Sequence, residues 1–219
     1  MKYPTAIDAS IAGRFVRHRS KDLGYKVMCV LAPLNKQAAA AVDVSALPLA
    51  WRSALAMSDW PAAATAIGWD RLVAHLPKTC ALLAEKLVGL GALLPGDEPP
   101  SLLYFFAGER SEIVVFEGFL PLKSPRKSVP PDLADFQRVH DGWYEFYSGE
   151  LGPMPQEEWE PLGEGSDDLI SVAIKGSNSL GFTRRTHAAH VVWPEDEEVE
   201  PAPSVTAALD DWIEAAFED

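Results

Sequence analysis

The apolar positions along this chain follow a helical period in the first part and a strand-like pattern in the second. Between residues 35 and 94, alanine and leucine dominate and β-branched residues are sparse, which is typical of helices. The clearest helix is expected over Lys78–Leu93, because leucine recurs at helical spacing at positions 83, 87, 90 and 94. An earlier apolar run, Tyr25–Leu31, is consistent with a buried strand ending at Pro33 or with a short helix.

Strand patterns begin after residue 100. Ser101–Phe106 and Glu112–Phe116 are rich in β-branched and aromatic residues, and Gly108–Arg110 between them suits a hairpin. Further along the chain, three more strands and an acidic turn are expected, at Asp168–Ile174, Ser179–Thr183, Ala188–Trp193 and Glu195–Glu200 respectively.

Two helices are expected among these strands. Asp132 is positioned to cap a short helix that runs to about His140. The last helix is amphipathic, and Asp210, Asp211 and Glu214 are expected to face away from its apolar surface. That apolar surface consists of Val205, Leu209, Trp212, Ile213 and Phe217.

This order of elements predicts an α+β fold, with an antiparallel or mixed sheet flanked by helices and a helix-rich N-terminal part. The segment Pro95–Pro100 interrupts the helical block and is the best candidate for a linker. We therefore expect a helix-rich part over residues 1–95, packed on the core, and an α+β domain over residues 96–219.

Charge is distributed unevenly along the 219 residues, whose net charge is −13. Residues 1–128 hold 15 Lys and Arg against 11 Asp and Glu, whereas residues 129–219 hold 4 against 21. Such an acidic half disfavours nucleic acid and anionic membranes as partners and attracts a basic macromolecule. The alternative is that the acidity only keeps the protein soluble.

A cytoplasmic location is expected. The first eight residues lack the apolar region of a secretory signal peptide, and the apolar run Ala81–Leu94 is too short to span a membrane. Cys29 and Cys80 stand far apart in apolar surroundings, which favours two buried free thiols.

No catalytic pattern stands out. The sequence has no Gly-x-Ser-x-Gly, P-loop or His-Glu-x-x-His motif. The pair His140 and Asp141 consists of chain neighbours whose side chains diverge, so a structural role is favoured for His140. His187 and His190 point to opposite faces if they lie on a strand, which disfavours a shared metal. We therefore expect a protein without enzymatic activity, cofactor or metal.

Residues 130–163 carry a recognisable pattern. Pro130–Phe136, Val139–Trp143 and Gly149–Pro155, followed by Trp159, resemble the SUKH superfamily, which includes bacterial immunity proteins and fungal regulators of cell-wall synthesis. The helix at Ala207–Ile213 matches the helix with which this family ends, and the similarity covers about residues 100–219. The motif residues are His140, Asp141, Gly142, Trp143 and Trp159. Gly142 is expected to end its helix in a left-handed cap, and both tryptophans are expected to be structural, with partner contact as the alternative.

The resemblance implies a cytoplasmic immunity protein that neutralises a cognate toxin, such as one delivered by type VI secretion, by covering its active cleft. The alternative within the same superfamily is an intracellular scaffold or regulator without enzymatic activity. The acidic clusters are either ordinary solvated faces or groups that imitate the phosphates which a basic toxin cleft binds. The residues expected to contact the partner are Glu157, Glu158, Asp167, Asp168, Glu195, Asp196, Glu197, Glu198 and Glu200.

Overall fold

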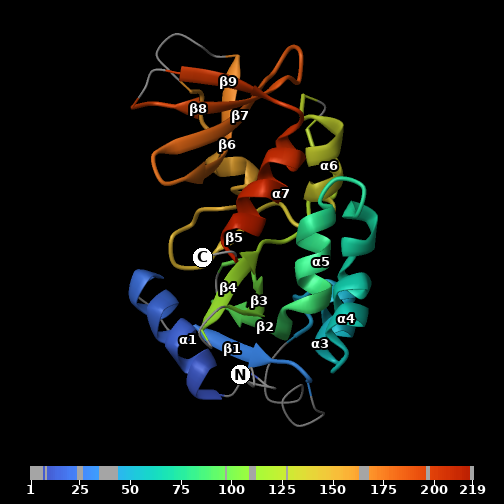
Figure 1. Cartoon of the computed structure of the whole chain (residues 1–219). Coiled ribbons are helices and arrows are strands. Elements are labelled where there is room, and N and C mark those ends of the chain that lie inside the picture. The colour runs from blue at the N-terminus through green and yellow to red at the C-terminus, as the bar shows by residue number, and fades with distance from the viewer. Residues whose placement is uncertain are drawn as a thin grey trace. The chain divides into compact units, whose positions relative to one another are not determined.

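The computed structural model of the chain is α+β, as the sequence predicts (Figure 1). It divides into two compact units: Met1–Asp70 with Leu82–Leu120, the first unit, and Arg71–Ala81 with Pro121–Asp219, the second unit. No helix in the described part of the chain is long and apolar enough to cross a membrane. The structure describes residues 7, 9–23, 27–34, 44–96, 98–108, 112–126, 128–162, 168–195 and 198–217.

The first unit is built on an antiparallel sheet. Its strands β1 (Met28–Leu31), β2 (Leu87–Leu94), β3 (Ser101–Ala107) and β4 (Ile113–Gly118) are neighbours in that order. β3 is buried along its whole length, because apolar residues occupy both of its faces. The strand predicted before Pro33 is confirmed, although only Val30 of its residues is buried, and the hairpin predicted after residue 100 is also confirmed.

In the described part of this unit, three helices accompany the sheet: α1 (Ala9–Leu23), α3 (Leu49–Leu55) and α4 (Trp60–Ile67). From α1, the ring of Phe15 packs edge-on against Phe105 of β3, with centroids 5.6 Å apart. Trp69, at the start of the 3-10 helix η1 (Trp69–Leu72), donates its indole N–H to the buried hydroxyl of Tyr104 at 2.9 Å. Aromatic contacts thus connect sequence-distant segments to the central strand.

The prediction of one helix from Lys78 to Leu93 is wrong in its second half. Helix α5 (Pro77–Glu85) ends early, and the next residues form the buried strand β2. A Cβ on Gly89 would lie 2.6 Å from Ile7, and one on Gly91 would lie 3.1 Å from the Val30 carbonyl oxygen. The glycines therefore permit close packing around a strand, and an unbroken apolar run cannot distinguish a strand from a buried helix.

The predicted boundary near residue 95 does not coincide with the division into units. Pro95–Pro100 connects β2 to β3, and these two strands pair along most of their lengths. Backbone hydrogen bonds between the two strands therefore place both sides of the expected linker in one sheet. The first 95 residues also contribute β1 and β2, so helices are only part of that segment.

The second unit contains another antiparallel sheet, in the order β6, β7, β8, β9. Its fourth strand was not expected, because the sequence Glu198–Ala202 is acidic and contains a proline. β9 occupies a sheet edge, where proline and charged residues are tolerated. The bounds are β6 (Leu169–Lys175), β7 (Asn178–Thr183), β8 (Ala189–Trp193) and β9 (Glu198–Ala202).

Helix α7 (Val205–Ala215) packs against β7 and β9, and also against α6 (Pro131–Gln137). Its apolar face was predicted correctly for Val205, Leu209 and Ile213, which are buried. Two short elements lie between α6 and β6: strand β5 (Trp143–Glu145) and the 3-10 helix η3 (Gln156–Glu158).

Two aspartates in this unit have roles other than those predicted. Asp132 does not cap its own helix, whose N-cap residue is Pro130; its carboxylate instead accepts a hydrogen bond from the Thr206 hydroxyl at 2.7 Å. Asp210 does not face away from the core and is only 3% exposed. Its carboxylate accepts the backbone N–H groups of Lys78 at 2.9 Å and Thr79 at 2.7 Å. It therefore satisfies N–H groups at the start of α5 that have no acceptor within the helix.

Candidate functional site

The acidic residues expected to contact a partner fall into separate groups. Glu195 lies in the turn after β8, and Glu198 and Glu200 lie on β9; all three are exposed, and we call them the acidic edge. Glu157 and Glu158 are exposed on η3, and Asp168 is exposed just before β6. Asp167, Asp196 and Glu197 lie outside the described residues.

The acidic edge and the η3 carboxylates belong to opposite sides of the second sheet. β9 forms one edge of the sheet and β6 forms the other. The segment that carries η3 lies beside β6, because isolated bridges join Pro153 to Ala173 and Pro161 to Ile170. With strands about 4.8 Å apart, three spacings separate the two edges by roughly 14 Å. The acidic residues therefore lie at the two opposite edges of this sheet.

Within the acidic edge, Glu198 and Glu200 share one face of β9. They are two residues apart on a strand, so their side chains project to the same side. Across the ladder, Glu198 is paired with Trp193 and Glu200 with Val191. The indole N–H of Trp193 is buried and has no hydrogen-bond partner among the described residues. The exposed Glu198 thus lies opposite Trp193, whose indole N–H has no hydrogen-bond partner in the described part of the chain.

Other carboxylates of this unit are engaged within the fold. Asp210 binds the start of α5, while the ammonium of Lys78 contacts Asp211 at 2.9 Å and Glu214 at 2.5 Å. These two contacts raise the pKa of Lys78. The carboxylate of Asp168 accepts the backbone N–H of Arg185 at 3.2 Å. Part of the acidity counted in the sequence therefore has an internal role.

The motif His140–Trp143 lies within the interior of the second unit. His140 and Trp143 are both fully buried. Gly142 does not adopt the left-handed conformation expected of it, and it is not a helix cap, because α6 already ends at Gln137. A glycine is needed there for another reason: a Cβ would lie 2.5 Å from the backbone nitrogen of Pro155.

Asp141 and Trp159 each form a hydrogen bond with the segment between them. The Asp141 carboxylate accepts the backbone N–H of Gln156 at 3.2 Å and the side-chain amide of Gln137 at 3.3 Å. Burial raises the pKa of Asp141, and the negative charge of Glu157 raises it further. Trp159 donates its indole N–H to the Met154 carbonyl at 2.9 Å and packs edge-on against Phe182. These contacts give the motif a structural role.

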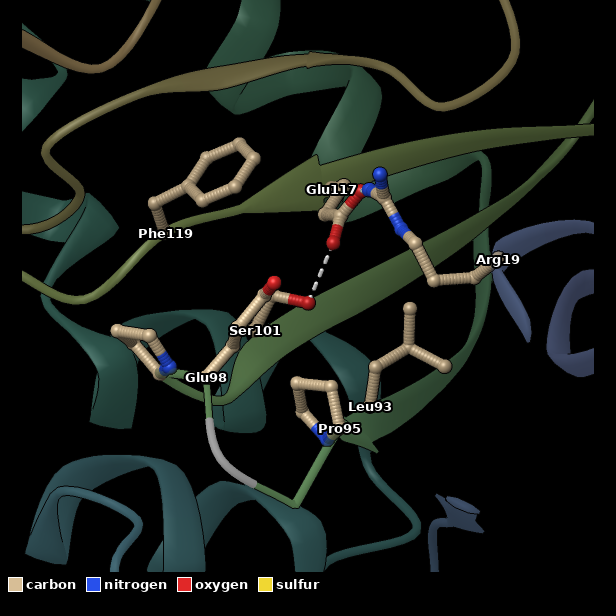
Figure 2. A pocket seen from close by; sticks show the side chains of 8 residues that line it. Arg19, Leu93, Pro95, Glu98, Ser101, Glu117 and Phe119 are labelled. Atoms are coloured by element: carbon tan, nitrogen blue, oxygen red, sulfur yellow. Dashed lines mark hydrogen bonds and ion pairs between the residues drawn. The ribbon is translucent and has the colours of Figure 1, made fainter. Parts of the chain in front are cut away.

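The first unit holds a small pocket that the sequence did not reveal (Figure 2). It lies where β2 ends, β3 begins and β4 ends, and its volume is about 70 Å³. We call it the carboxylate pocket, after its most buried polar group, Glu117, which is 2% exposed. Its lining residues are Arg19, Leu93, Pro95, Glu98, Pro99, Ser101, Glu117 and Phe119.

Two side chains hold the Glu117 carboxylate. Figure 2 shows the hydroxyl of Ser101 directed at one carboxylate oxygen, to which it donates at 2.5 Å. Arg19 of α1 pairs with the other oxygen. The buried charge is thus neutralised by a guanidinium and hydrogen-bonded by a hydroxyl, which makes its burial tolerable.

The sequence contains only a weak signal for the pairing of Arg19 with Glu117. Glu117 is the only acidic residue of β4, and Arg19 follows Phe15 by four residues, so both occupy the buried face of α1. An arginine on an apolar helical face and a glutamate at the end of an apolar strand suggest buried partners. Only the tertiary structure identifies them as partners of one another.

The structure provides no metal centre in its described part, where no three His, Cys, Asp or Glu side chains are close enough to hold an ion. His187 lies in the turn before β8, and its ring packs edge-on against Phe182. Neither Cys29 nor Cys80 forms a disulfide, and burial raises the pKa of the Cys29 thiol to about 12, which disfavours its reactive thiolate.

Comparison with known proteins adds no assignment. The chain matches no protein-family model, and no curated protein or solved structure is detectably similar to it. The resemblance to the SUKH superfamily therefore stays a prediction.

Proposed function

We propose that the chain is a non-enzymatic binding protein that neutralises a toxin domain by covering its basic active-site cleft. The observation that carries this proposal is the unequal charge of the two units. The second unit holds 21 Asp and Glu against 9 Lys and Arg, whereas the first holds 11 against 10. A net charge of −12 in one unit and −1 in the other concentrates the attraction for a basic partner in the second unit.

The acidic edge is the part of this unit best suited to such contact. Glu195, Glu198 and Glu200 are exposed, and they lie on an edge strand and the turn before it. By contrast, Asp210 is buried and Asp211 and Glu214 are bound to Lys78, so these three are less available to a partner. Carboxylates on one strand face also occupy alternate positions, which sets a spacing for basic residues of the partner.

The test is co-expression with the toxic domain encoded by the neighbouring gene. Rescue of growth and co-purification are the expected results. The variant with Glu198→Lys and Glu200→Lys should bind at least tenfold more weakly and with a smaller dependence of affinity on salt, because like charges then face the basic cleft. Binding should be measured by calorimetry at two salt concentrations.

The matched control is the variant with Glu157→Lys and Glu158→Lys, which makes the same charge change on the opposite side of the second sheet. Its affinity should decrease much less than that of the acidic-edge variant. Equal losses in both variants would mean that only net charge matters, and co-purification without rescue would favour a scaffold that binds without neutralising.

A further inference from the structure

The carboxylate pocket adjoins a second hollow in the first unit. This second pocket has a volume of about 210 Å³, and we call it the apolar pocket. Pro95 and Glu98 line both pockets, so the two hollows share a wall. We call the carboxylate pocket the polar end and the second pocket the apolar end. The apolar pocket is lined by Met28, Ala46, Leu94, Pro95, Gly96, Glu98 and Pro100.

The polar end is better suited to a cation than to an anion. Its described lining residues include two carboxylates, Glu98 and Glu117, and one guanidinium, which is already paired with Glu117. The hydroxyl hydrogen of Ser101 is used by Glu117, so the Ser101 oxygen remains only as an acceptor. The ring of Phe119, at the same end, is a further group that attracts a cation.

The apolar end suits a short hydrocarbon chain. Among the described residues that line it, only Glu98 carries a charge, and Met28, Leu94 and Pro100 supply aliphatic surface. Met28 is 44% exposed, so this wall is accessible to a ligand from solvent. Methionine also adapts its shape to different apolar groups.

We propose that the two pockets bind an amphipathic primary amine, with its ammonium at Ser101 and Glu98 and its alkyl chain against Met28 and Leu94. Two sources share this chemistry: a free aliphatic amine, and a lysine beside an apolar residue in a peptide. The site belongs to the first unit, and it does not depend on the acidic edge.

A series of alkylammonium ions from ethyl to hexyl tests the joined site, with binding followed by calorimetry on the full chain. Each added methylene should tighten binding by about fourfold, because it enters the apolar pocket. Hexanol and hexanoate are the controls for the charge, and both should bind more weakly than hexylammonium. A flat length series, or hexanoate binding as tightly as hexylammonium, would overturn the proposal.

Variants locate the binding. Glu98→Gln should raise the Kd of hexylammonium about fivefold and leave that of hexanol unchanged, because only the ammonium interacts with the carboxylate. Met28→Ser should reduce the gain per methylene. Glu112→Gln is the matched control, since this exposed carboxylate precedes β4, far from the pocket at the other end of the strand. An unchanged Kd in Glu98→Gln, or equal losses in both glutamate variants, would contradict the site.

The source is distinguished by a capped Leu-Lys dipeptide. A Kd within tenfold of that of hexylammonium supports a lysine carried by a peptide. A Kd more than tenfold weaker, with hexylammonium still bound, supports a free amine. Absence of binding by both ligands at tens of millimolar would reject the inference.

Discussion

Each unit of this chain buries a carboxylate, and the two do so by different means. In the first unit, Glu117 is paired with Arg19 and hydrogen-bonded by Ser101. In the second unit, Asp210 receives only hydrogen bonds, from two backbone N–H groups and the hydroxyl of Thr79. The ammonium of the nearby Lys78 contacts Asp211 and Glu214.

The difference shows what each arrangement depends on. A buried ion pair requires both ions to lose water, so the loss of one partner leaves the other charge uncompensated. The start of a helix supplies fixed partial positive charge from its own backbone, and no second ion has to be buried. Removal of Arg19 should therefore destabilise the first unit more than removal of the Asp210 carboxylate destabilises the second unit.

The largest effect is expected from Arg19→Leu, which leaves Glu117 buried without its cation. The free energy of unfolding of the first unit should fall by about 3 kcal/mol. The double variant Arg19→Leu with Glu117→Leu should recover much of this loss, because two apolar side chains need no compensation. Hydrogen exchange of the β3 and β4 amides in urea gives both values. A double variant as unstable as the single one would show that packing, rather than charge, dominates at this site.

A smaller effect is expected from Asp210→Ala. This substitution leaves the N–H groups of Lys78 and Thr79 without their acceptor, and should cost the second unit about 2 kcal/mol. The amides of the first turn of α5 should also exchange faster. The neighbouring Asp211→Ala is the control, since Asp211 is exposed and bound only to Lys78, and it should change stability little. Similar losses in both variants would contradict the capping role.

The sequence predicted elements whose patterns are local. The β3–β4 hairpin and the helix α7 were expected because alternation and helical spacing appear within a dozen residues. β2 was misassigned, since its leucines also fit a helical period, and β9 was missed because an edge strand can be acidic. In each case the tertiary environment decided the structure.

The candidate site was harder to predict than the fold. The exposed positions of Glu198 and Glu200 agree with a surface role, but no local pattern indicates that Asp210 is buried. The carboxylate pocket joins Arg19, Ser101 and Glu117, which are separated by up to 98 positions. No local pattern reports such a contact.

Asp141 extends the comparison to a half-buried carboxylate that has two hydrogen bonds and, among the described residues, no cation as a direct partner. Burial raises its pKa above 3.8, so this carboxyl binds a proton more tightly in the folded state than in the unfolded state. The ionised carboxyl therefore lowers stability at neutral pH, and this penalty disappears as the pH falls through the folded pKa toward 3.8.

Asp141→Asn, which keeps an acceptor oxygen and removes the charge, should raise the stability of the second unit by roughly 0.5 kcal/mol at pH 7, a small value because solvent screens a half-exposed group. Urea unfolding of both proteins between pH 7 and pH 4 should show the difference shrinking as the pH falls. Glu160→Gln is the control, because Glu160 is an exposed carboxylate of the same unit. A gain in Asp141→Asn that stays constant with pH would show that the amide improves hydrogen bonding, and that the charge of Asp141 is not a burden to the fold.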